Sequence, residues 1–115
     1  MVLDFNINIT EEKKAHTVRV AGDIAIYTSP KLKSFLKNLL GAGPKNVVLN
    51  LENVKYIDST GLGTIVFLSK ELYKKERGFS IVSQSLQLKK IFEVAGLTKK
   101  NILIFEEESL ALASL

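Results

Sequence analysis

The chain has 115 residues, of which 46% are hydrophobic and 24% charged, and it carries a net charge of +4. This length suits one domain with one core, and no apolar run approaches the roughly 20 residues that a membrane-spanning helix needs. The absence of cysteine excludes disulfides, thiolate catalysis and zinc–thiolate sites, and the start at Met1 to Asp4 lacks the basic and apolar regions of a secretory signal, so we expect a cytoplasmic protein.

The first predicted elements form a hairpin. Apolar and polar residues alternate from Leu3 to Thr10, which predicts a half-buried strand, and they alternate again from His16 to Ala21. A polar turn separates the two runs, and Gly22-Asp23 ends the second. His16 is the only histidine. It lacks Asp, Glu or Cys neighbours at metal-ligand spacing, so we expect it on the surface or at an edge.

Ser29-Pro30 predicts the start of the first helix. Serine is a favoured N-cap, and proline is favoured at the first helical position. Apolar residues follow at helical spacing from Leu32 to Leu40, and the run Gly41 to Pro44 is typical of a helix end.

Strands and helices alternate in the rest of the chain. The next strand, at 46–51, is nearly all apolar, as expected for a strand covered on both faces. The elements predicted after it are, in chain order, a helix with its apolar side at 62–73, a strand at 79–83, a helix at 88–95, a strand at 102–105 and a short helix that starts near 106–108. The order β-β-α-β-α-β-α-β-α predicts one α/β domain over residues 1–115, with a mixed sheet whose central strands are parallel and covered by about four helices.

The segment Tyr56 to Gly63 lies between a predicted strand and a predicted helix. Ser59 and Thr60 therefore fall in a tight turn or in the first helical turn, where backbone N–H groups are free and the helix dipole is positive. Such a place suits a phosphate, or a small side chain that a partner inspects closely. We interpret Asp58 as a cap of this helix rather than as a base.

Gly61 and Gly63 permit two interpretations. They resemble a phosphate-cradling loop, but a third glycine at dinucleotide-binding spacing and the Gly-Lys-Ser/Thr end of a P-loop are both absent. We therefore expect these glycines to permit a tight turn and close packing of the helix on the sheet.

The residue inventory argues against an enzyme. Nothing suggests that His16 approaches Ser59 to form a catalytic triad. A carboxylate pair of Asp23 and Asp58 would need a cleft, for which a small domain with short loops has little room. We expect no metal and no cofactor. The lysines are scattered and interleaved with acidic residues, which predicts a solvated surface of mixed sign and no direct contact with nucleic acid or membrane.

A reversible modification of Ser59 fits this pattern. Phosphate adds a charge of roughly −1.5 to −2, which a helix N-terminus favours by about 0.3 to 1 kcal/mol. The same charge, pressed into a desolvated contact next to Asp58, costs roughly 3 to 4 kcal/mol, or two to three orders of magnitude in affinity. One hydroxyl would thus switch a complex without refolding the domain.

The segment Val54 to Gly63 resembles the signature of bacterial anti-sigma factor antagonists, which are STAS-domain proteins. Further counterparts are Gly22-Asp23-Ile24, the helix from Ser29-Pro30, the strand Val47 to Leu51 and the segment Phe92 to Leu97. The resemblance covers nearly the whole chain, so it implies a single STAS domain.

The resemblance also implies a partner-switching mechanism. The unphosphorylated antagonist binds an anti-sigma factor, which is commonly also a serine kinase, and thereby frees the sigma factor for transcription. Phosphorylation ends this binding, and a manganese- or magnesium-dependent serine phosphatase restores it. Carried over, the phosphorylated residue is Ser59, with Thr60 as a secondary acceptor. The residues on or near the partner-facing surface would be Asp23, Ile24, Tyr27, Thr28, Asp58, Thr60, Gly61 and Leu62.

One position departs from the pattern of the family. Members often carry an acidic residue three positions after the glycine that ends the second strand, where this chain has Ala25, and its acid lies earlier, at Asp23. Two other functions stay open from the residues. One is a sensory domain that binds a nucleotide or another small ligand at Gly61-Leu62-Gly63, and the other is a scaffold subunit of a signalling assembly.

Overall fold

Five strands form one mixed sheet in the computed structural model, which describes residues 4–43, 45–100 and 102–115. The strands, in their order across the sheet, are β1 (Asn6–Glu11), β2 (Ala15–Ala21), β3 (Asn46–Asn53), β4 (Phe79–Val82) and β5 (Leu103–Phe105). β1 is antiparallel to β2, and the pairs from β2 to β5 are parallel. The predicted mixed sheet with parallel central strands is confirmed. Leu3 and Pro44, which belong to the predicted first strand and the predicted helix end, lie outside the described residues.

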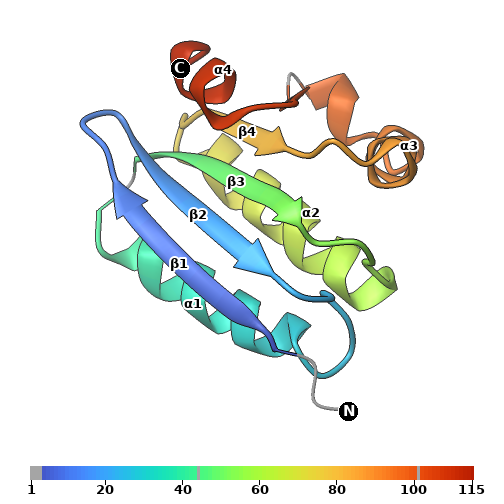
Figure 1. Ribbon diagram of the computed structural model, residues 1–115. Helices are drawn as coiled ribbons and strands as arrows, with labels where there is room; N and C mark the ends of the chain where they lie inside the picture. Colours follow the sequence, from blue (N-terminus) through green and yellow to red (C-terminus); the bar gives the residue numbers. More distant parts are fainter. Residues whose placement is uncertain (1–3, 44, 101) are drawn as a thin grey trace.

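Within the described residues, four helices alternate with the strands from β2 onward, so the predicted order of elements is confirmed. They are α1 (Ser29–Gly41), α2 (Ser59–Lys74), α3 (Leu86–Val94) and α4 (Glu108–Ala113). Figure 1 shows α1 and α2 on one face of the sheet and α4 against β3, β4 and β5 on the other. A short 3-10 helix, Leu97–Lys100, precedes β5, and four residues are too few to reveal a helical period in the sequence.

The alternation of side chains along the strands sets the core. Val18 on β2 and Leu49 on β3 lie in the main core with the apolar residues of α1 and α2, and both are fully buried. Val48 faces the other way and packs with Val82 and Ala111, the last of which belongs to α4. β3 is thus covered on both faces, as its continuous apolar run predicts.

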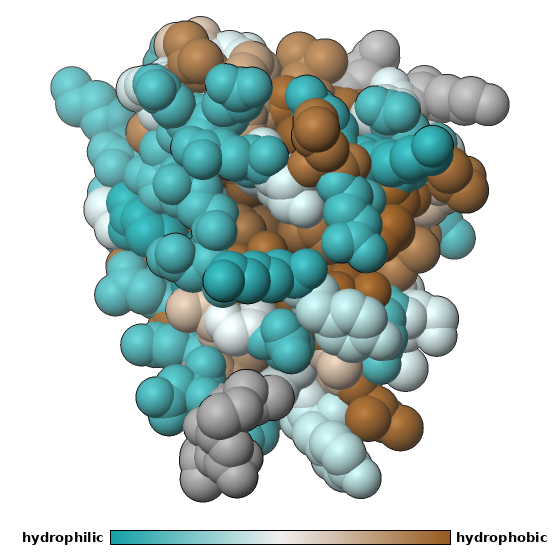
Figure 2. Space-filling view, turned by 45° about the vertical axis from the view of Figure 1, so that its right-hand side comes forward, coloured by the Kyte–Doolittle hydropathy of each residue, from teal (hydrophilic) through white to brown (hydrophobic). Residues whose placement is uncertain are grey.

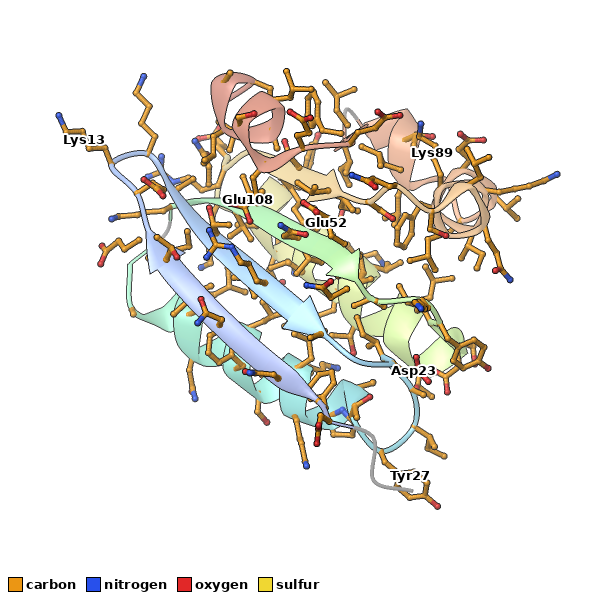
Figure 3. All side chains as sticks on the ribbon, viewed as in Figure 1. Lys13, Asp23, Tyr27, Glu52, Lys89 and Glu108 are labelled. Carbon is orange, nitrogen blue, oxygen red and sulfur yellow. The ribbon has the colours of Figure 1, made fainter. Side chains whose placement is uncertain are left out.

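An ion pair fastens α4 to the face of the sheet that lies opposite α1 and α2. Arg19 Nε donates to Glu108 Oε2 at 2.6 Å, and Arg19 Nη2 donates to Glu108 Oε1 at 2.8 Å. This two-pronged geometry is the strongest that a guanidinium and a carboxylate form. Asn50 Nδ2 also donates to Glu108 Oε2, at 2.5 Å. The Arg19 hydrogen bond is the largest cause of the lowered pKa of Glu108, and Figure 3 shows this carboxylate over the sheet near β3.

The predicted N-cap of α1 is wrong by one residue. Thr28 is the N-cap, and Ser29 is the first helical residue and is buried. The Ser29 hydroxyl donates to the backbone oxygen of Thr60 at 3.1 Å and lies 3.2 Å from the hydroxyl of Thr64. Because the Ser29 hydroxyl bonds to residues of α2, it links the first turns of α1 and α2 and does not cap α1.

The expected surface or edge position of His16 is also wrong. His16 is only 9% exposed, and its strand has β1 on one side and β3 on the other. Its Nδ1 atom is buried and has no hydrogen-bond partner among the described residues. Burial is the largest cause of the lowered pKa of His16, Lys45 lowers this pKa further, and Glu11 opposes them.

This burial predicts that the domain loses stability in mild acid. The unfolded chain takes up a proton at His16 near the usual pKa of about 6.5, whereas the folded chain does so only at lower pH. The free energy of unfolding should therefore be unaffected by His16 above pH 6.5 and should fall as pH drops from 6.5 toward the lowered pKa. Urea unfolding at pH 7.5, 6.5 and 5.5 measures this, with His16→Gln as the control variant. The same decline in both proteins would contradict the prediction.

Candidate functional site

Two loops meet at the carboxyl ends of β2 and β3, beside the first turn of α2 (Figure 1). The Ile24 N–H donates to the Tyr56 oxygen at 3.1 Å, and the Asp58 N–H donates to the Ile24 oxygen at 3.1 Å. These bonds form an isolated parallel bridge between Ile24 and Ile57. Ligands and partners of open α/β sheets commonly approach at this end of the strands. Because the bridge joins the two loops, both lie on the surface at this end of the sheet.

Asp58 is the N-cap of α2, as predicted. Its carboxylate accepts the Gly61 N–H at 2.9 Å and the Thr60 hydroxyl at 2.6 Å. The Thr60 hydrogen bond, followed by that of Gly61, lowers the pKa of Asp58. A carboxylate held ionised by these donors is a poor proton acceptor for the hydroxyl of Ser59, which favours the capping role over a catalytic one.

Ser59 and Thr60 differ in how far their hydroxyls are already engaged. Both residues are exposed, but the Thr60 hydroxyl donates to Asp58, and the Thr60 backbone oxygen accepts from Ser29. The Ser59 hydroxyl has no hydrogen-bond partner within the described ranges 4–43, 45–100 and 102–115. It therefore lies free in the first turn of the 16-residue helix α2, where the dipole and free N–H groups favour an anion. This arrangement favours Ser59 over Thr60 as an acceptor of phosphate.

Gly61 is required for the close approach of α2 to the loop after β2. A Cβ atom at this position would lie 2.4 Å from the Ile24 oxygen and 2.9 Å from Ile57 Cγ2. The predicted packing role is confirmed for Gly61. It is wrong for Gly63, where a Cβ atom would meet nothing within 4 Å. Since Ile24 fills the space beside Gly61, the geometry favours packing over a phosphate-cradling loop.

The predicted partner-facing residues gather around these loops, but they are not equally accessible. Tyr27 is 86% exposed, whereas the side chain of Ile24 is fully buried and Gly61 lies beneath the surface. Figure 3 shows Asp23 and Tyr27 at the same end of the molecule. The Thr28 hydroxyl accepts the Ala25 N–H at 2.9 Å and donates to the Asp23 oxygen at 2.6 Å. Thr28 and Ile24 thus shape the loop from within.

Two exposed apolar residues at this end were not among the predicted contacts. Ile26 is 62% exposed and Tyr56 is 53% exposed. Both lie in the loops that carry the predicted residues. Their position next to those residues in the sequence could have identified them as contacts. Large apolar side chains in the open are typical of surfaces that bind other molecules.

A hollow of about 830 Å³ lies between the loop after β2 and the start of β1. Its lining includes Asp4, Phe5, Asp23, Tyr27, Lys31 and Tyr56. The expectation that such a small domain leaves little room for a cleft is therefore wrong. Ala25 also lines this hollow and Asp58 does not, so Asp23 and Asp58 do not form a carboxylate pair within it.

The part of the chain that the structure describes has neither a membrane-spanning helix nor a metal-binding cluster. No helix there has both the length and the apolar character needed to cross a bilayer. No group of three or more His, Cys, Asp or Glu residues is arranged to hold a metal ion there.

Comparisons with known proteins give matches over most of the chain. The family model described as the STAS domain matches residues 6–111. A protein of Staphylococcus aureus, named anti-sigma-B factor antagonist, is 36% identical over 95 residues, which are 83% of this chain and 88% of that protein.

Solved structures show the same fold at lower identity. An anti-sigma factor antagonist from Mycobacterium paratuberculosis has a TM-score of 0.84 and 22% identity, over 96% of this chain and 93% of its own. The Bacillus cell fate determinant SpoIIAA, solved in its phosphorylated form, has a TM-score of 0.76 and 17% identity, over 96% and 98% of the two chains. The strand and helix order described above is therefore that of a known architecture.

Proposed function

This chain belongs to the STAS domain family, and on that basis we propose that it is an anti-sigma factor antagonist whose binding is switched at Ser59. It acts as a regulatory binding protein rather than as an enzyme. In its unphosphorylated form it holds an anti-sigma factor and so releases the sigma factor. The named role of the Staphylococcus aureus relative supports this function.

The observation that carries the proposal is the free, exposed hydroxyl of Ser59 at the capped start of α2. Asp58 holds the first turn through Gly61 and Thr60, so the helix end is already formed before any modification. A phosphate on Ser59 is stabilised by the helix dipole, and adding it requires no rearrangement of the turn. The modification therefore changes the affinity for the partner and leaves the fold of the domain unchanged.

The anti-sigma factor in this proposal is also the serine kinase that uses ATP to modify Ser59, and a serine phosphatase restores the hydroxyl. The exchange takes place in the cytoplasm. The partner covers the loops after β2 and β3, and its contacts include the exposed Tyr27 and Thr60, the half-buried Asp23, Asp58 and Leu62, and the loop shaped by Ile24, Thr28 and Gly61.

Intact-mass spectrometry tests the acceptor. The purified protein, incubated with ATP and an extract of its own cells, should gain one phosphate. Thr60→Val should also gain it, because Thr60 contributes its hydroxyl to Asp58, and Ser59→Ala should gain none. A phosphate kept by Ser59→Ala and lost by Thr60→Val would assign the acceptor to Thr60. No gain in an extract with demonstrated kinase activity would contradict the switch.

A further inference from the structure

A second, apolar hollow lies between α2 and α3. It measures about 370 Å³ and is lined by Leu62 of α2 and by Gln87, Lys90, Ile91, Val94 and Ala95 from α3 and its C-terminal end. Val94 is 81% exposed although it is a large apolar residue. Figure 2, which brings this side of the molecule forward, shows hydrophobic side chains gathered among hydrophilic ones in the centre and on the right.

The hollow continues the surface on which Ser59 lies. Leu62 follows Ser59 by three residues on α2, and residues three apart lie on the same side of a helix. A protein large enough to cover the Ser59 hydroxyl therefore also reaches Leu62 and the α3 residues beside it. The hollow is open on its outer side, which suits a side chain inserted from another protein.

The charge of the hollow limits what it accepts. Lys90 is the one charged residue in its described lining, and Gln87 is the one other polar residue. Glu93 lies on the same helix but does not line the hollow. An apolar side chain is favoured at the centre, because Leu62, Ile91 and Val94 line it and burying apolar surface is favourable. A carboxylate is favoured at the rim, beside the Lys90 ammonium.

We propose that this hollow is the second half of the partner-binding surface, and that it receives an apolar side chain of the anti-sigma factor flanked by an acidic residue. The proposal rests on the proposed function and deepens it. The acidic residue of the partner beside Lys90 is also repelled by a dianion on Ser59, which lies about one helical turn from Leu62 of the same hollow.

Two variants test the hollow against the purified anti-sigma factor of the same cell, with affinities measured by titration calorimetry. Lys90→Glu should bind about tenfold more weakly or worse, because it places like charges together. Val94→Ser should lose about tenfold by removing an exposed apolar contact. Since Lys90 and Val94 are exposed, both proteins should fold as the wild type does, which circular dichroism checks.

Matched controls lie on the same helix. Leu86 is 79% exposed and, like Lys89, does not line the hollow, so Leu86→Ser and Lys89→Glu should keep wild-type affinity. Equal losses in test and control variants would overturn the proposal in favour of a general effect of charge or of α3. Wild-type affinity in both test variants would also overturn it and leave the proposed function standing. A wild-type protein that does not bind the anti-sigma factor would refute the proposed function itself.

Discussion

Ser59→Asp should fold like the wild-type protein and bind its anti-sigma factor about two to three orders of magnitude more weakly. The fold is expected to survive because the start of α2 favours a negative charge and because the Ser59 hydroxyl makes no hydrogen bond within the described structure. The partner, in contrast, would have to desolvate a carboxylate next to the ionised Asp58, at a cost of roughly 3 to 4 kcal/mol.

Neutral substitutions at the same position separate charge from size. Ser59→Asn matches the size of Asp without its charge and should lose far less affinity. Ser59→Ala should bind whether or not the kinase and ATP are present, because nothing can be added to it. Titration calorimetry and thermal unfolding of the four proteins measure both effects. Equal affinity of the wild type and Ser59→Asp would disprove the switch.

Gly61→Ala should destabilise the domain by about 1 to 3 kcal/mol, the usual cost of forcing an extra group into a packed site. The added methyl group would lie 2.4 Å from the Ile24 backbone oxygen, and a backbone atom cannot move aside as a flexible side chain does. The loop after β2 would therefore shift away from α2. Because this loop is part of the proposed partner surface, binding should weaken as well.

Gly63→Ala is the matched control, two residues further along the same helix. A Cβ atom there meets nothing within 4 Å, and alanine is favoured over glycine inside a helix by about 0.5 to 1 kcal/mol. The free energy of unfolding, measured in urea, should fall for Gly61→Ala and rise slightly for Gly63→Ala. A rise for both variants would show that helix propensity, and not the contact with Ile24, governs Gly61.

The sequence was sufficient wherever neighbours in the chain decide the structure. The cap by Asp58 needs only the donors of Thr60 and Gly61, which follow it directly, and the strand alternation depends on period alone. The sequence does not predict that Ser29 lies inside the helix, because its hydroxyl bonds to Thr60, 31 residues away. Local propensity contains no information about such a partner.

Two further features differ from the sequence prediction for different reasons. His16 occupies the same face of β2 as the buried Val18, two residues on, so the alternation itself indicated an inward position that the polarity of the side chain obscured. The hollow beside Leu62 depends on the distance between α2 and α3, and the side chains that line it come from two segments of the chain. No period in either helix indicates it.

The ion pair between Arg19 and Glu108 has a consequence for the order of folding during synthesis. The two residues are 89 positions apart, so their contact closes a loop of most of the chain, and such long-range contacts form late. The ribosome releases β1, β2 and β3 well before α4. Until Glu108 emerges, the nascent sheet exposes the Arg19 guanidinium and the apolar surface of Val48 on that face. A growing chain is thus more prone to aggregation than the finished protein. This tendency is greatest when β1 to β5 have formed and α4 has not yet docked.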